Sequence, residues 1–294
     1  MNQQQIGTSN SKTTFIGGRP FVWGSRTYLM GVINTTPDSF SGDGTGMDVD
    51  GAVRQGVRFQ QEGADIVDVG GESTRPPNVY AGSKPVSAQE ELDRVLPVVD
   101  ALQRELDTPI SIDTYKAEVA REALKLGATM VNDVWGFRRD PDMAAVVAKS
   151  ALPVVLMHNQ GHTNYDGDVV TEVIRVLGEL ANSAVAAGVA PENIILDPGM
   201  GFGKTAQHNL EILRRLPEFQ ALDKPLLIGM SRKSTIGLVL DLPPDDRVEG
   251  TAAAVALSIA GGADIVRVHD VKEMVRVARM SDAIVRGWNP PASG

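Results

Sequence analysis

The chain has 294 residues, of which 42% are hydrophobic and 22% charged, and these proportions are ordinary for a globular protein with a large core. The formal net charge is −9, because 37 Asp and Glu residues outnumber 28 Lys and Arg residues, and this acidity disfavours a nucleic-acid partner. Cysteine is absent, which excludes disulfides, thiol nucleophiles and cysteine-ligated metals.

The chain begins with a polar segment, residues 1–14, that lacks the apolar core of a signal peptide. We expect this segment to be a disordered lead. Eight short apolar runs follow, and each precedes a segment in which apolar residues recur at helical spacing. The predicted strands are 28–34, 64–70, 109–113, 129–133, 153–158, 194–197, 225–231 and 265–270. The predicted helices are 49–62, 87–106, 115–126, 141–150, 168–188, 206–221, 246–261 and 271–286.

Eight strand–helix units in succession predict parallel strands, because the crossover between parallel strands needs a covering helix. Eight such units close a (β/α)8 TIM barrel of the α/β class. The alternative is an open doubly wound sheet, whose usual Gly-x-Gly-x-x-Gly turn is missing after the first strand, in residues 33–40. We therefore predict a single barrel domain over 15–288 and a flexible tail over 289–294, with long loops at 35–48 and 71–86 that are typical of functional lids.

No apolar stretch reaches the ~20 uncharged residues that a membrane-spanning helix needs. Together with the polar lead, this predicts a cytoplasmic protein with neither a membrane nor a nucleic-acid partner.

Polar side chains end the predicted strands, where the active site of a barrel lies. For any single Asp or Asn, capping of the next helix is an equal alternative, but caps do not explain polar residues at all eight ends. The residues at these ends are Asn34, Asp68, Glu72, Asp113, Asn132, Asp133, His158, Asp197, Ser231, Arg232, Lys233, Arg267, His269 and Asp270.

The last predicted strand carries two basic groups on one face, because Arg267 and His269 are two residues apart. A guanidinium beside an imidazole suits an anion such as phosphate. The alternative is an internal ion pair between Arg267 and a carboxylate, either Asp113 or Asp68. The seventh predicted strand ends in the run Ser231-Arg232-Lys233-Ser234. Its lysine, Lys233, could act as a Schiff-base nucleophile, a hydrogen-bond donor or a solvated charge.

Residues 199–205 resemble a phosphate-binding P-loop, but Pro198 stands where that pattern needs glycine. A glycine-rich loop at the barrel mouth with one aromatic residue, Phe202, fits the sequence better. The four histidines lack the spacing of a zinc site. A hard cation such as Mg²⁺ needs few protein ligands when a diphosphate supplies the others, and Asn34 could provide one oxygen.

Taken together, the strand ends resemble the dihydropteroate synthase family of folate biosynthesis. The matching segments occur in order, one at each strand end, between about Phe15 and Arg286. They read MGVINTTPDSFSGDG, DVGGESTRPP, SIDTYKAEVA, VNDVWGF, VVLMHNQG, ILDPGMGFGKT, IGMSRKSTIG and RVHDVKEM.

The resemblance implies a (β/α)8 barrel that is usually a homodimer. It also implies a transferase that joins 6-hydroxymethyl-7,8-dihydropterin diphosphate to p-aminobenzoate with the help of Mg²⁺, forming 7,8-dihydropteroate and diphosphate. Sulfonamides would bind in the p-aminobenzoate pocket, and the absence of insertions in GESTRPP and SRKSTIG predicts sensitivity to them.

Position by position, the resemblance also implies the site residues. The pterin would contact Asp113, Asn132, Asp197, Lys233 and Arg267. The p-aminobenzoate pocket would include Phe40, Thr74, Arg75, Pro76, Phe202, Lys233 and Ser234. The diphosphate would contact Asn34, Arg267 and His269, with Mg²⁺ on Asn34. The implied catalytic residues are Asp38, Lys233, Arg267 and His269. The family more often has Ser-Asp-Gly-Gly where this chain has SGDG, so Asp43 is shifted by one residue.

Three other functions compete with this one. Pterin-binding barrels of corrinoid-dependent methyltransferases lack the TPDSF and SRKS segments that are present here. An inactive pterin-binding protein would be favoured by the loss of Lys233 or Arg267, and both are retained. A Schiff-base aldolase would carry its lysine on the sixth strand, which ends in Asp197.

Overall fold

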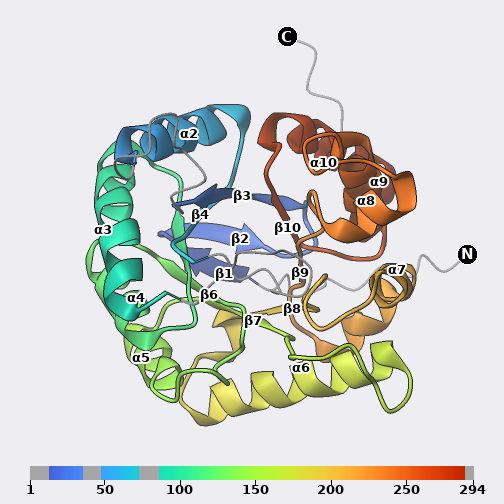
Figure 1. Ribbon diagram of the computed structural model, residues 1–294, viewed down its shortest axis with the longest axis horizontal. Helices are drawn as coiled ribbons and strands as arrows, with labels where there is room; N and C mark the ends of the chain where they lie inside the picture. Colours follow the sequence, from blue (N-terminus) through green and yellow to red (C-terminus); the bar gives the residue numbers. More distant parts are fainter. Residues whose placement is uncertain (1–12, 36–47, 73–85, 289–294) are drawn as a thin grey trace, which may run out of the picture.

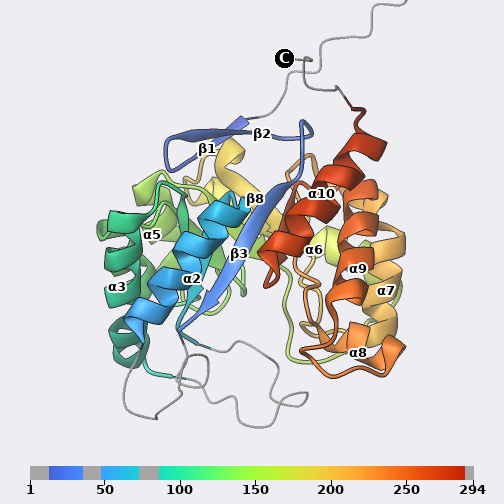
Figure 2. The same cartoon turned by 90° about the horizontal axis from the view of Figure 1, so that it is seen from above.

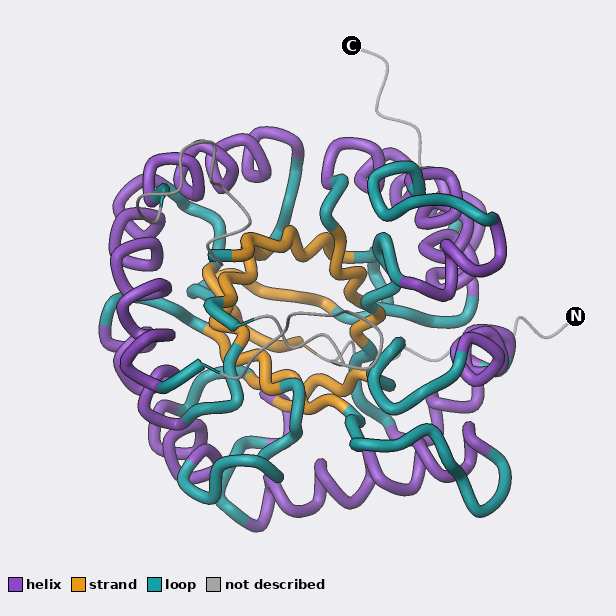
Figure 3. Tube along the Cα trace, viewed as in Figure 1, coloured by secondary structure: helices purple, strands orange, loops and turns teal. Residues whose placement is uncertain are grey.

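Eight parallel strands form the wall of a barrel that is surrounded by helices (Figure 1; Figure 3). The computed structural model describes residues 13–35, 48–72 and 86–288. The barrel strands are β3 (Tyr28–Asn34), β4 (Ile66–Gly70), β5 (Ile110–Asp113), β6 (Met130–Asp133), β7 (Val154–Met157), β8 (Ile194–Asp197), β9 (Leu227–Ile228) and β10 (Ile265–Val268). The helices are α2 (Val49–Glu62), α3 (Ala88–Glu105), α4 (Ala117–Lys125), α5 (Met143–Ser150), α6 (Val169–Ala186), α7 (Ala206–Arg214), α8 (Ser234–Leu240), α9 (Val248–Ala260) and α10 (Val271–Val285).

The strand order confirms the predicted barrel. Each strand pairs in parallel with its neighbours in the order β8-β7-β6-β5-β4-β3-β10-β9. A parallel bridge between Leu196 and Leu226, with a hydrogen bond of 2.9 Å from the Leu196 N–H to the Pro225 carbonyl, joins the two ends of this order. The helices cover the outside of the barrel, as right-handed crossovers between parallel strands require.

Alternation along the strands separates two cores. One set of side chains packs outward against the helices, and the other set points into the barrel. Near the amino ends of the strands, the inward set is apolar and includes Met30, Ile66, Met130, Ile195 and Ile265. The residues two positions further on share this inward direction and lie at the carboxyl ends of the strands. The barrel therefore has an apolar floor beneath its functional end.

The hairpin of β1 (Thr13–Ile16) and β2 (Arg19–Val22) was not predicted, and it lies across the amino ends of the barrel strands (Figure 2). Gly17 and Gly18 both have positive φ, as a tight two-residue hairpin turn requires. Ile16 and Phe21 pack onto the apolar floor. Because β1 begins at Thr13, the last two residues of the expected lead, 13 and 14, belong to this hairpin.

Two helical segments also differ from the prediction. The helix expected over 206–221 ends at Arg214, and a 3-10 helix, η2 (Leu216–Leu222), follows, because Pro217 has no backbone N–H for helical bonding. The short helix α8 was not predicted, and it lies between β9 and the covering helix α9, after residues 229–233. Short extra helices of this kind are frequent in TIM barrels. Among the helices of the described ranges, none combines the length and apolar character needed to cross a bilayer.

Candidate active site

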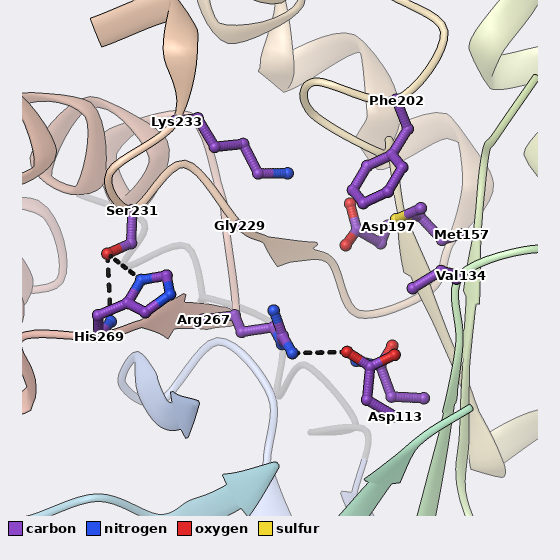
Figure 4. Close-up of a pocket in the computed structure, with 11 residues that line it drawn as sticks. Asp113, Val134, Met157, Asp197, Phe202, Gly229, Ser231, Lys233, Arg267 and His269 are labelled. Atoms are coloured by element: carbon purple, nitrogen blue, oxygen red, sulfur yellow. Dashed lines mark hydrogen bonds and ion pairs between the residues drawn. The ribbon is translucent and has the colours of Figure 1, made fainter. Parts of the chain in front are cut away.

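A pocket lies at the carboxyl ends of the barrel strands, at the end opposite the β1–β2 hairpin (Figure 2; Figure 4). It brings together eight of the residues that the sequence singled out: Asp113, Asn132, Asp197, Phe202, Ser231, Lys233, Arg267 and His269. Val134, Met157 and Gly229 complete its lining. Inward-facing positions of four strands, β5, β6, β8 and β10, and the segment that follows β9 supply the polar groups, which is why residues far apart in sequence meet here.

Arg267 lies at the centre of the pocket beside Asp113 (Figure 4), and its guanidinium also pairs with Asp68. Its Nε donates to Asp68 Oδ2 at 2.6 Å, and its Nη2 donates to Asp113 Oδ2 at 2.7 Å. The amide of Asn132 donates to the same oxygen of Asp68 at 2.9 Å. The internal ion pair that was the alternative to phosphate binding is therefore formed, with both of the carboxylates considered. These two contacts hold the guanidinium in one orientation.

The carboxylates of Asp113 and Asp197 lie in a low-dielectric environment. Burial raises the pKa of Asp113 to about 7, against the opposing effect of Arg267 and with the added effect of Asp68. Burial also raises the pKa of Asp197, while the Lys233 ammonium and a 2.7 Å hydrogen bond from the Gly199 N–H oppose this shift. Asp113 Oδ1 is buried and accepts no hydrogen bond from the described residues. The pocket therefore offers an acceptor for the N–H group of a ligand.

Lys233 and Phe202 form the opposite side of the pocket. The Lys233 side chain donates to the Met200 carbonyl, and its Nζ lies 4.6 Å from the centre of the Phe202 ring. Of the three roles open to this lysine, hydrogen-bond donation is the one that this geometry favours. The ammonium and the face of the aromatic ring attract one another. The Phe202 ring thus forms a flat wall on this side of the pocket, which we call the Phe202 wall.

His269 projects from the end of β10 beside Arg267, as the spacing of the two residues predicts (Figure 4). Its Nδ1 lies 3.0 Å from the Ser231 hydroxyl, which also accepts the His269 backbone N–H at 3.1 Å. These two contacts to Ser231 fix the position of the imidazole.

Other expected residues lie elsewhere. Asn34, at the end of β3, and Ser234, the first residue of α8, are half-buried and do not contribute to the lining of the pocket. Asp133 points outward and accepts the backbone N–H groups of Trp135 and Phe137, at 2.8 and 2.7 Å. It therefore has a structural role in the turn that follows β6, although it does not cap the next helix, α5. Five expected residues lie outside the described ranges: Asp38, Phe40, Thr74, Arg75 and Pro76.

Comparison with known proteins matches residues 30–269 to the family of pterin binding enzymes. The chain is 50% identical over 272 residues to the dihydropteroate synthase of Clostridium beijerinckii, covering 92% of this chain and 99% of that protein. It is 49% identical to the Bacillus subtilis dihydropteroate synthase, covering 88% and 89% of the two chains.

The chain belongs to the dihydropteroate synthase family. The expected family, fold class and transferase activity are confirmed. Among solved structures, the Clostridium difficile dihydropteroate synthase, determined in the presence of pteroic acid, superposes with a TM-score of 0.87 at 53% identity, covering 90% of this chain and 99% of that one. The Xanthomonas albilineans dihydropteroate synthase with 4-aminobenzoic acid has a TM-score of 0.88 at 42% identity, covering 94% and 98%.

Two buried polar residues beside the pocket, Asp68 and Lys204, were not among the residues expected to bind substrate in this member of the dihydropteroate synthase family. Asp68 is fully buried and holds both Arg267 and Asn132. Lys204 is buried beside His158, behind the Phe202 wall. The alternation of inward positions could have added Asp68 to the site, since it shares its direction with Ile66. No pattern in the sequence distinguishes a buried lysine in a glycine-rich loop from a solvated one.

Proposed function

We propose that the family's reaction takes place in the pocket around Arg267 by a dissociative substitution. In this reaction 6-hydroxymethyl-7,8-dihydropterin diphosphate is joined to p-aminobenzoate, and diphosphate is released. The observation that carries the proposal is the asymmetry of the pocket: buried carboxylates and an amide lie on one side, basic groups at the centre, and an aromatic wall on the other. Among the described residues that line the pocket, no side chain is placed as an obvious base for the arylamine. A neutral arylamine needs none, because its lone pair is free.

The buried side of the pocket suits a pterin ring. The 2-amino-4-oxo edge of a pterin presents adjacent N–H donors, and one carboxylate, such as that of Asp197, can accept two of them side by side. The unpartnered oxygen of Asp113 can accept a further N–H. Asn132 and Lys233 can contact the ring nitrogens and the carbonyl. Each buried polar group of this wall would then have a partner, as burial requires.

The diphosphate is proposed to lie against Arg267 and His269, which would neutralise its charge as it leaves. The described residues hold no cluster of three His, Asp or Glu side chains that could bind a metal by themselves. Magnesium commonly has few protein ligands when a substrate diphosphate supplies the others. Asn34 and the oxygens of the substrate would hold the Mg²⁺ here. Bound there, Mg²⁺ would supply Lewis-acid stabilisation of the leaving diphosphate.

In the first step, the bond between the pterin methylene carbon and the diphosphate oxygen breaks, and the oxygen keeps the electron pair. The positive charge on the methylene is delocalised into the dihydropterin ring. In the second step, the amine nitrogen of p-aminobenzoate forms the new bond to carbon and loses a proton to water. The residues proposed to hold p-aminobenzoate are Phe40, Thr74, Arg75, Pro76, Phe202, Lys233 and Ser234, with Asp38 also contributing to catalysis.

Support for the arylamine site comes from relatives. The Xanthomonas albilineans dihydropteroate synthase was solved with 4-aminobenzoic acid and with 7,8-dihydropteroate, and the Yersinia pestis enzyme with a sulfonamide drug. We therefore expect sulfonamides to compete with p-aminobenzoate in this chain. Normal turnover at high sulfonamide concentration would contradict this expectation.

Positional isotope exchange tests the dissociative step. We expect ¹⁸O placed in the bridge between the methylene and the phosphorus to move into non-bridging positions when enzyme, Mg²⁺ and pterin diphosphate are incubated without p-aminobenzoate. The exchange requires that the carbon–oxygen bond breaks before the amine attacks, and mass spectrometry of recovered substrate measures it. An enzyme-free sample is the control. Active enzyme that never exchanges the label would contradict a dissociative step.

We also propose a homodimer that associates through α9 and α10, which lie side by side (Figure 1). Four large apolar residues of these helices are exposed: Leu257 by 65%, Met280 by 63%, Ile284 by 72% and Val285 by 47%. Exposed apolar residues gathered on neighbouring helices are typical of subunit interfaces. Light scattering is expected to give twice the chain mass of 31.4 kDa.

We also propose that the protein is located in the cytoplasm and has neither a nucleic acid nor a membrane as a partner.

A further inference from the structure

The glycine-rich loop, residues 199–205, packs unusually closely against the segment that follows β7. Gly199, Gly201 and Gly203 all have positive φ. A Cβ on Gly199 would lie 1.8 Å from the His158 carbonyl oxygen, and a Cβ on Gly203 would lie 2.6 Å from that of Gln160. Side chains at these two positions are therefore excluded, and the loop follows one path over the end of the barrel.

Lys204 anchors this loop from beneath. The side chain is only 7% exposed, and its Nζ lies 2.8 Å from His158 Nδ1 and 3.0 Å from the Phe202 carbonyl oxygen. Burial lowers the pKa of His158 to about 2, with added effects from Lys204 and Arg138, so the imidazole is neutral. Its Nδ1 therefore accepts a hydrogen bond from Lys204. Burial also lowers the pKa of Lys204, but both the ammonium and the amine have enough N–H bonds for the two acceptors.

A second contact holds the next carbonyl along the loop. The Tyr165 hydroxyl donates to the Gly203 carbonyl at 3.0 Å, and the Tyr165 ring stacks near His158 with 6.2 Å between ring centres. The carbonyls of residues 202 and 203 are therefore both held by side chains outside the pocket, the buried Lys204 and the half-buried Tyr165. The ring of Phe202 projects into the pocket instead, toward Lys233 (Figure 4).

We infer that Lys204 is a positioning residue for the arylamine substrate. By bonding to both His158 and the Phe202 carbonyl, it fixes the backbone at residue 202 and thereby the position of the Phe202 ring. The inference rests on the proposed function, in which Phe202 forms a wall of the p-aminobenzoate pocket. The hydrogen-bond partners of Lys204 are His158 and the Phe202 carbonyl, and among the described residues its only link to the carboxylates of the pocket is an electrostatic effect that opposes the raised pKa of Asp197. We therefore expect its main effect on the arylamine and a smaller one on the pterin. Its amine is enclosed by His158 and the Phe202 carbonyl, which leaves it no role as a nucleophile.

Lys204→Met keeps the length of the side chain and removes the donor. We expect the KM for p-aminobenzoate to rise about tenfold, because two buried acceptors lose their hydrogen bonds and the loop relaxes. The Kd of 6-hydroxymethyl-7,8-dihydropterin diphosphate, measured by calorimetry, is expected to change less than twofold. Lys149→Met, an exposed lysine on α5, is the matched control and should change neither quantity.

A double-mutant cycle identifies the route of the effect. If Lys204 acts through Phe202, then Phe202→Ala combined with Lys204→Met should have the same KM for p-aminobenzoate as Phe202→Ala alone. If the KM of the double variant rose by the product of the two single-variant effects, the positioning role would be overturned. So would a rise in the pterin Kd as large as the rise in KM, because it would indicate general loosening of the barrel mouth.

Tyr165→Phe keeps the proposal testable if Lys204→Met does not fold. It removes only the hydroxyl that holds the Gly203 carbonyl, and we expect a rise of about threefold in the KM for p-aminobenzoate with an unchanged pterin Kd. An unchanged KM in this variant would contradict the proposal. Failure of the proposed function itself is distinguishable: the unmodified protein would not consume p-aminobenzoate, or Phe202→Ala would leave its KM unaltered.

Discussion

Arg267→Lys is expected to lower kcat/KM for the pterin substrate by about 100-fold or more. Arg267 contacts Asp68 and Asp113 through two different nitrogens of one planar group, at 2.6 and 2.7 Å. Lysine keeps the positive charge but has a single nitrogen, so it cannot hold both carboxylates and also face the leaving diphosphate. Losing one aligned donor to a developing anion typically costs that much. Steady-state kinetics with both substrates measures the effect.

Arg175→Lys is a matched control for this variant. Arg175 also pairs with two carboxylates, Glu172 and Glu179, but on the exposed surface of α6. We expect this change to leave kcat/KM within the error of the assay, because exposed ion pairs contribute little. An Arg267→Lys variant that stayed within threefold of the unmodified protein would contradict the central role given to this guanidinium.

The affinity for the pterin substrate is expected to fall about tenfold between pH 8 and pH 6. Burial raises the pKa of Asp113 to about 7, so below this pH the carboxyl group carries a proton and loses part of its capacity to accept the N–H groups of a pterin. The fraction of protein with an ionised Asp113 changes about tenfold over this interval, and the apparent affinity follows it. Calorimetric titration with 6-hydroxymethyl-7,8-dihydropterin at both pH values measures the change.

The same shift affects folding. The ordinary pKa of this carboxyl group is 3.8, so between pH 3.8 and about 7 the folded protein binds more protons at Asp113 than the unfolded chain does. Its contribution to the free energy of unfolding is therefore full below pH 3.8 and decreases as the pH rises through this window.

The variant Asp113→Asn is the control for the pH dependence of binding, and it is expected to bind pterin more weakly and with little pH dependence. An unchanged pH dependence in Asp113→Asn would assign the titration to another group.

Much of the barrel could be predicted from the sequence, because each strand and its covering helix carry their own local pattern. The strand Tyr28–Asn34 and the helix Val49–Glu62 were predicted with their observed bounds. Most of the pocket could also be predicted, because a barrel strand points every second residue inward. Arg267 and His269 lie two apart and both reach the pocket for this reason.

The rest depends on partners that are distant along the chain. Arg267 and Asp68 are 199 residues apart, so the sequence could suggest their ion pair but could not choose between it and phosphate binding. The β1–β2 hairpin escaped prediction because its strands have only four residues each, although two adjacent glycines marked the turn. The burial of Lys204 follows from the closeness of the glycine-rich loop to His158, which no local pattern reveals.

The most direct test of the pocket's role is a product assay with Lys233→Ala as the comparison. The protein is supplied with 6-hydroxymethyl-7,8-dihydropterin diphosphate, p-aminobenzoate and Mg²⁺, and dihydropteroate and diphosphate are measured. We expect both products in equal amounts from the unmodified protein and a loss of both in Lys233→Ala, because Lys233 lies between the pterin side and the Phe202 wall. Tight pterin binding without product from the unmodified protein would contradict the proposed chemistry and favour a pterin-binding role without condensation.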